Sequence, residues 1–176
     1  SLNNSLDDFV LLGNLADGEL KLRISRAIQR RVHDHQLQQD GALLESLLDN
    51  IPDSIFFKDR QSRLIKTSKS MARVYGHNHE SIIGKTDFDL FSKEHAQQAY
   101  DDEHEIIRTA TPMVSKVEKE TFRDGEINWV STTKLPLKDA RGRIIGTMGI
   151  SRNVTALKQV EDDLNQERSL LETIIE

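Results

Sequence analysis

The sequence predicts an α+β domain: a five-stranded antiparallel sheet with short helices on one face, flanked by N- and C-terminal amphipathic helices. Two observations carry this prediction. The β-rich runs fall at both ends of the central region, with short helical segments between them. Turn signals at Asp124-Gly125 and over residues 139–142 then join the later runs as hairpins. Strands grouped in this way form a mainly antiparallel sheet, and the intervening helices cover one of its faces.

The N-terminal part of the chain is typical of helix. Apolar residues recur every four positions at Leu20, Ile24 and Ile28, within a helix expected from residue 17 to about residue 39. Gly41 is expected to interrupt this helix. A second amphipathic stripe then follows and ends before Pro52, because proline cannot continue a helix.

The central region alternates between strand and helix signals. The strands are expected at 55–57, 63–67, 113–122, 126–139 and 143–153. The helices are expected at 68–76, 80–83, 87–91 and 93–109, with a last helix from about 154. Ser68 is the expected N-cap of the first of these helices, and Gly76 its end.

Composition excludes several classes of function. The net charge is -5 and no segment forms a basic stripe, which argues against nucleic acid as a partner. The chain has no cysteine, so disulfides and thiolate chemistry are excluded. No apolar run is long enough to span a bilayer, and we expect a cytoplasmic location without membrane contact. No nucleophile with a base and no phosphate-binding loop is visible, so we expect no enzyme activity in this chain.

An ordered set of short motifs resembles the PAS family over about residues 42–157. The motifs are Ile51 to Asp59, Tyr75-Gly76, Ile83 to Phe91, Trp129 to Leu137, Ile145-Gly146, Gly149-Ile150 and Arg152 to Thr155. The resemblance departs at two positions, since the family usually has asparagine where this chain has Ser68, and aspartate where it has Asn153. Asn153 can form hydrogen bonds but no ion pair. The resemblance implies that Arg152, Asn153 and Thr155 relay a signal into the last helix.

Further resemblances suggest a longer domain organisation. Residues 8–13 with the following helix are similar to the last strand and helix of receiver domains, although Leu12 stands where that family has lysine. Residues 43–49 also resemble residues 170–176, as a repeated domain start would. We therefore expect a receiver-like fragment and connector helix at 1–40, a PAS domain at 41–157, and a coiled-coil linker at 158–176 leading to a second PAS domain.

The PAS resemblance implies a small pocket between the sheet and the helices. Its expected lining residues are Phe57, Ile65, Met71, Tyr75, Phe88, Tyr100, Ile107, Trp129, Ser131 and Met148. Such a pocket would suit a small organic ligand, and the alternative is a packed core without any ligand. Some PAS domains bind haem through a histidine on the long helix, which here would be His104. No cofactor or metal is otherwise expected.

These observations favour a sensory and dimerisation module of a multidomain signalling protein, of the histidine kinase or cyclic-dinucleotide enzyme type. Leu157, Val160, Leu164, Leu171 and Ile174 follow a heptad rhythm. We therefore expect a homodimer through the flanking helices, with other signalling domains of the same protein as partners. The alternatives are a haem-binding gas or redox sensor that uses His104, and a small enzyme that uses the pocket.

Overall fold

The fold follows the expected order of helices and strands. A computed structural model describes residues 17–76 and 79–175. Its elements are α2 (Asp17–Asn50), β1 (Ser54–Asp59), β2 (Leu64–Thr67), α3 (Lys69–Val74), α4 (His79–Ile82), α5 (Asp87–Leu90), α6 (Lys93–Thr109), β3 (Met113–Thr121), β4 (Ile127–Lys138), β5 (Ile144–Asn153) and α7 (Thr155–Ile175). The described residues divide into two compact units, with the boundary between residues 46 and 47.

Helix α2 corrects one expectation, because it runs through Gly41 without a break. A glycine in an exposed helix costs about 1 kcal/mol relative to alanine. A long helix tolerates that cost, so the glycine alone does not divide it. Within the second unit, Leu48 near the end of α2 is 1% exposed and belongs to the core.

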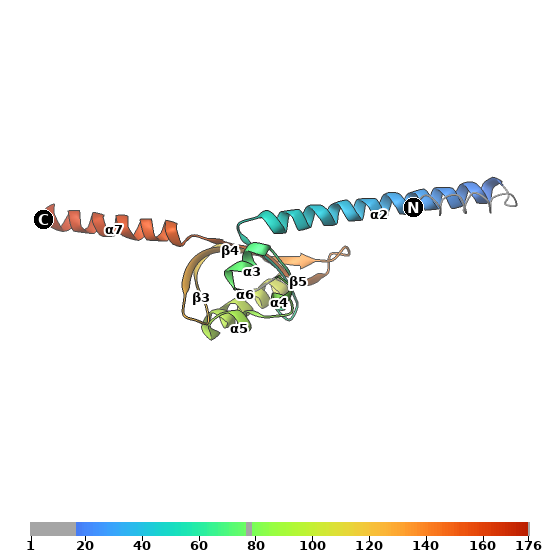
Figure 1. Ribbon diagram of the computed structural model, residues 1–176. Helices are drawn as coiled ribbons and strands as arrows, with labels where there is room; N and C mark the ends of the chain where they lie inside the picture. The colour runs from blue at the N-terminus through green and yellow to red at the C-terminus, as the bar shows by residue number, and fades with distance from the viewer. Residues whose placement is uncertain (1–16, 77–78, 176) are drawn as a thin grey trace. The chain divides into compact units, whose positions relative to one another are not determined.

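The sheet has the strand order β2-β1-β5-β4-β3, and every neighbouring pair is antiparallel. The predicted five-stranded antiparallel sheet is therefore confirmed. Helices α3 to α6 lie together on one side of it (Figure 1). Ser68 caps α3 as expected, and its Oγ accepts a hydrogen bond from the Met71 backbone N–H at 3.3 Å.

The alternation of side chains along β1 and β4 decides what faces the helices. Phe56 and Lys58 are buried on β1, and Val130, Thr132 and Lys134 are buried on β4. Successive side chains of a strand point to opposite faces, so the residues between these positions face away from the helices. The inner face therefore carries two lysines among its apolar and hydroxyl side chains.

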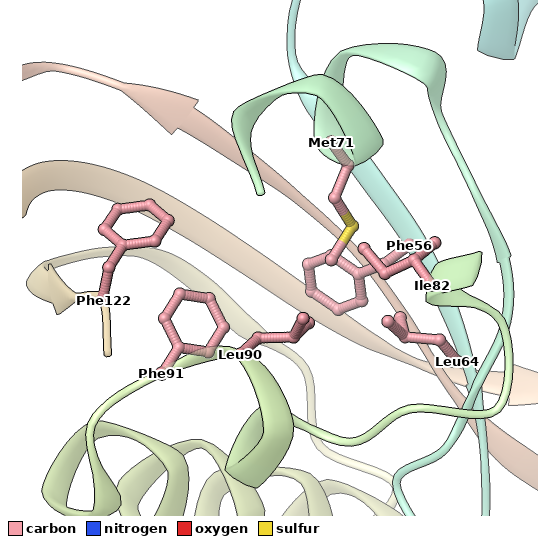
Figure 2. Close-up of a cluster of buried hydrophobic side chains, with 7 residues drawn as sticks. All are labelled: Phe56, Leu64, Met71, Ile82, Leu90, Phe91 and Phe122. Atoms are coloured by element: carbon pink, nitrogen blue, oxygen red, sulfur yellow. The ribbon is translucent and has the colours of Figure 1, made fainter. Parts of the chain in front are cut away.

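A cluster of buried apolar side chains joins the helices to the sheet (Figure 2). Its members are Phe56, Leu64, Met71, Ile82, Leu90, Phe91 and Phe122. They come from β1, β2 and helices α3, α4 and α5, together with the turns that follow α5 and β3. Burial of each such side chain contributes about 1.5–3 kcal/mol to folding.

Two glycines of β5 are required by close packing against neighbouring strands. A Cβ atom at Gly146 would overlap the Lys58 backbone carbonyl, and one at Gly149 would lie 2.5 Å from the Phe56 ring. The absence of a side chain at both positions lets β1 pack closely against β5. Lys58, which is buried, lies on β1. The glycines of this motif are therefore needed for packing.

We predict that Gly146→Ala will lower the free energy of unfolding by about 3 kcal/mol, because the new methyl group must displace β1. Urea denaturation followed by circular dichroism measures this change. The control is Gly41→Ala, where the added Cβ meets nothing within 4 Å. That substitution should stabilise α2 by about 1 kcal/mol. Equal effects of the two substitutions would contradict the packing role of Gly146.

Candidate functional site

The centre of the domain holds a network of buried charged side chains. Lys58 Nζ of β1 lies 2.6 Å from Asp87 Oδ2 of α5 and 2.6 Å from Glu103 Oε1 of α6. Lys134 Nζ of β4 lies 3.4 Å from the same Glu103 oxygen and donates to the Ala99 carbonyl at 3.3 Å. We call Lys58, Asp87, Glu103 and Lys134 the ion cluster. Their exposed fractions are 2%, 6%, 0% and 4%.

Local structure places each carboxylate of the ion cluster. Thr86 begins α5 by donating its backbone N–H to Asp89 Oδ2 at 2.8 Å, and this cap sets Asp87 at the first helical position. Glu103 lies on the face of α6 that also carries Ala96, Ala99 and Ile106, all of them buried. Residues three and four apart share a helix face, so Glu103 points into the core.

Electrostatics keep Lys58 charged despite its burial. Burial alone would lower the pKa of Lys58, but the charges of Asp87 and Glu103 outweigh this effect and raise it above the ordinary lysine value. Glu103 Oε2 has no hydrogen-bond partner in the described part of the chain. Buried ion pairs often add little net stability, yet removing one partner leaves a charge unpaired and is strongly destabilising.

A cavity of about 30 Å³ lies beside the ion cluster. Its walls are Ser54, Phe56, Lys58, Met71, Tyr75, Asp87, Phe91, His95, Ala99, Glu118, Glu120, Thr132, Lys134 and Ser151. This volume accommodates two or three water molecules at most, because one water molecule needs about 10–15 Å³. The cavity is therefore small, and most of the residues that line it are polar.

Glu120 and Tyr75 form a second buried pair at this cavity. The Tyr75 hydroxyl donates to Glu120 Oε1 at 3.2 Å. Burial is the main cause that raises the pKa of Glu120 to about 7, and burial also raises the pKa of Tyr75 well above its ordinary value. Burial likewise lowers the pKa of His95, whose Nδ1–H donates to the Lys119 carbonyl at 3.0 Å.

The structure brings only two of the expected pocket residues, Met71 and Tyr75, to the cavity wall. The strand residues expected there face the other side of the sheet: Phe57, Trp129, Ser131 and Met148. The physical reason is the two-residue period of a strand, in which an error of one position exchanges the faces. The inward residues of these strands include Lys58, Thr132 and Lys134.

The other expected pocket residues lie away from the cavity. Ile65 is 49% exposed, Phe88 39% and Tyr100 36%. Ile107 is half-buried on α6 and does not line the cavity. The rings of Phe88 and Tyr100 instead contact each other, with centroids 6.2 Å apart.

His104 is also outside the cavity. Its Nδ1–H donates to the Tyr100 carbonyl of the same helix at 2.9 Å, and the rings of the two residues lie 3.8 Å apart. Among the described residues, no group of histidines and carboxylates has the geometry of a metal site. Along the same residues, no helix is long and apolar enough to cross a membrane.

The three expected relay residues lie at the junction of the sheet with α7. Arg152 Nη2 forms an ion pair with Asp53 Oδ2 at 2.8 Å, which links the segment before β1 to the end of β5. Asn153 Oδ1 accepts the Thr155 backbone N–H at 2.9 Å. Thr155 Oγ1 in turn accepts the Trp129 backbone N–H at 2.9 Å, and the Val154 N–H donates to the Trp129 carbonyl at 2.8 Å.

The ion cluster and Glu120 were not predicted from the sequence, although the sequence contains one signal for the two lysines. Lys58 follows Phe56 by two positions, and Lys134 follows Val130 by four. Each lysine therefore shares a face with an apolar residue. A lysine at such a position is either at the rim of the sheet or paired in the core. Its partners come from distant helices, so the pairing itself was not visible in the sequence.

Comparison with known proteins identifies the fold. The PAS fold family matches residues 48–159. The chain is 27% identical, over 139 residues, to the methanogenesis regulatory histidine kinase FilI of Methanothrix harundinacea. The matched region covers 79% of this chain and 16% of FilI. It is 24% identical to the aerobic respiration control sensor ArcB of Escherichia coli, over 73% of this chain and 16% of ArcB. It is 22% identical to a diguanylate cyclase of Vibrio cholerae, over 73% of this chain and 40% of the cyclase.

Solved structures show the same fold. A PAS domain from Colwellia psychrerythraea has a TM-score of 0.56 at 21% identity, and covers 68% of this chain and 98% of that one. A complex of Vibrio cholerae VqmA with a ligand and DNA has a TM-score of 0.56 at 24% identity. The match covers 62% of this chain and 49% of the VqmA chain. The comparisons give no support to the receiver-like fragment, whose strand at 8–13 lies outside the described residues.

The expectation about partners is wrong. It combined a homodimer through the flanking helices with the exclusion of nucleic acid and of membrane contact. Solved neighbours of the same fold include a DNA complex of VqmA, so net charge does not exclude that class of partner for the fold. The neighbours show the fold alone, and they show no nucleic-acid binding by this chain. The heptad residues Leu157, Val160 and Leu164 are more than 60% exposed on α7.

We predict that Lys58→Met will lower the free energy of unfolding by about 3–5 kcal/mol, because it removes the cation of buried Asp87 and leaves buried Glu103 with Lys134 alone. Urea denaturation at neutral pH measures the change. Lys69→Met is the matched control, since Lys69 pairs with Asp49 at 2.6 Å on the surface. It should cost less than about 1 kcal/mol. A similarly small loss in Lys58→Met would contradict the role of the ion cluster.

Proposed function

Because this chain belongs to the PAS fold family, we propose that it is a sensory module of a multidomain signalling protein of the histidine kinase or cyclic-dinucleotide enzyme type. The similarity to histidine kinases and to a diguanylate cyclase supports this proposal. The chain spans 16% of the length of the first curated relatives it matches. The output activity is therefore assigned to other parts of such a protein, and no catalytic step is assigned to this chain.

The observation that carries the proposal is the junction between the sheet and α7. The backbone of Trp129 holds both Val154 and Thr155, so the first turn of α7 is tied to β4. Arg152 and Asp53 connect the segments that enter and leave the sheet. A change in the packing of the sheet would move these contacts and bias the start of the helix. Such a switch needs a difference of only a few kcal/mol between two states.

The domain organisation proposed with this function places the sensory domain at 41–157 and a linker helix at 158–176. The linker would lead toward a second domain of the same kind. The similarity between residues 43–49 and residues 170–176 supports this arrangement, because the first copy immediately precedes the sensory domain.

The interior geometry favours a small or absent ligand over haem. The cavity of about 30 Å³ is far smaller than the several hundred Å³ typical of organic-ligand pockets. His104 is held by its own helix and does not line this cavity. We therefore propose a module whose input acts on the polar interior.

The proposal is tested by fusing the whole chain in frame to a histidine kinase output domain and measuring autophosphorylation. We predict that Arg152→Ala will change the kinase activity at least about twofold, with little effect on stability, because exposed ion pairs contribute less than about 1 kcal/mol. The matched control is Arg168→Ala, which removes the exposed pair of Arg168 with Glu172 (3.0 Å) from α7. Equal activity of the two variants and the unsubstituted fusion would contradict a relay through Arg152.

A further inference from the structure

Glu120 is a buried acid that the ion cluster does not neutralise. It lies on β3, is 7% exposed, and receives its one described hydrogen bond from the Tyr75 hydroxyl. The ion cluster is balanced without it, because Lys58 and Lys134 face Asp87 and Glu103 at contact distance. A negative charge on Glu120 is therefore in excess of the two cations of the ion cluster. A neutral phenol compensates a buried carboxylate much less than a cation does.

The titratable groups around Glu120 come from most of the elements that enclose the cavity. They are Lys58 of β1, Tyr75 at the end of α3, Asp87 of α5, His95 of α6, Glu118 of β3 and Lys134 of β4. Asp87 and Glu118 repel a negative charge on Glu120, and Lys134 attracts one. Glu118 lies close to Lys116 at 3.2 Å, so its own charge is compensated. The surroundings thus favour a protonated Glu120 without forcing it to remain so.

We propose that Glu120 is a proton-binding site inside the sensory domain, and that its protonation is an input which the domain passes to α7. The proposal rests on the sensory function proposed above, and it names the ligand as the proton. Loss of the proton places a charge next to Asp87 and Glu118. The adjoining cavity has room for the water that would hydrate this charge.

The site is a short distance along the sheet from the junction with α7. Lys119, the neighbour of Glu120, is the cross-strand partner of Trp129. The backbone of Trp129 holds Val154 and Thr155 at the start of α7. The carbonyl of Lys119 also accepts the hydrogen bond from His95 of α6. A shift of β3 around Glu120 would therefore reach the helical layer through the hydrogen bond between Lys119 and His95, and the junction through the pairing of β3 with β4.

The sign of the pH effect follows from the raised pKa. The folded state binds the proton of Glu120 more tightly than the unfolded chain does, because its pKa rises from the ordinary 4.5 to about 7. The stability that this proton contributes is complete below the ordinary pKa and is lost as the pH rises through about 7. His95 acts in the opposite direction, because its lowered pKa destabilises the fold as the pH falls.

The test compares Glu120→Gln with the unsubstituted chain by urea denaturation between about pH 5.5 and about pH 8.5. The difference between the two midpoints cancels the contribution of His95. We predict that the unsubstituted chain loses stability relative to Glu120→Gln as the pH rises. Glu118→Gln should keep this loss and move it to lower pH, because the charge of Glu118 is one of the causes that raise the pKa of Glu120. Parallel curves for Glu120→Gln and the unsubstituted chain would overturn the proposal.

Two further measurements keep the proposal testable if Glu120→Gln does not fold. Tyr75→Phe removes the hydrogen bond that lowers the pKa of Glu120, so the loss of stability should move to higher pH. The amide signal of Thr155 in NMR spectra should shift with the same pH midpoint as Glu120. A Thr155 signal that ignores this titration would overturn the role of the proton as an input. An effect of Arg152→Ala in the kinase fusion would still support the sensory function.

Discussion

Lys58 is the point at which the helices and the sheet depend on each other. Its ammonium group joins β1 to α5 through Asp87 and to α6 through Glu103, and its own backbone is packed against Gly146 of β5. Taking these charges out of water costs several kcal/mol for each ion. The cost is offset only when all the partners are in position, so the helices can lie on the sheet in few ways. This requirement gives the small domain a specific interior.

The order of the elements could be predicted from the sequence, because turn residues and helix caps are local signals. Asp124-Gly125 and Ser68 had the expected roles. The inward face of the sheet could not be predicted in the same way. Strand β4 has apolar residues on both faces, with Val130 inside and Trp129 outside, so periodicity did not distinguish the faces. The relay residues were placed together because they are neighbours in sequence.

The ion cluster shows why a site can be hidden in a sequence whose fold is visible. Lys58 and Glu103 are 45 residues apart, and only the tertiary structure brings their charges together. The cavity beside the ion cluster has mostly polar residues in its wall and little free volume. It differs from the pocket for a small organic ligand that the family resemblance implied. Under the proposal made for Glu120, the interior changes state when this side chain gains or loses a proton. Binding of a large ligand is not required.

The central claim is that Lys58 and Lys134 are charged and enclosed in the core. Nitrogen-15 NMR of the lysine side chains tests it most directly, because an enclosed ammonium group exchanges its protons with water slowly. We expect two ammonium signals, from Lys58 and Lys134, that remain visible at neutral pH while exposed lysines are lost to exchange. Assignment by Lys58→Met and Lys134→Met would confirm their origin. Rapid exchange at every lysine would contradict the enclosure of Lys58 and Lys134 in the core.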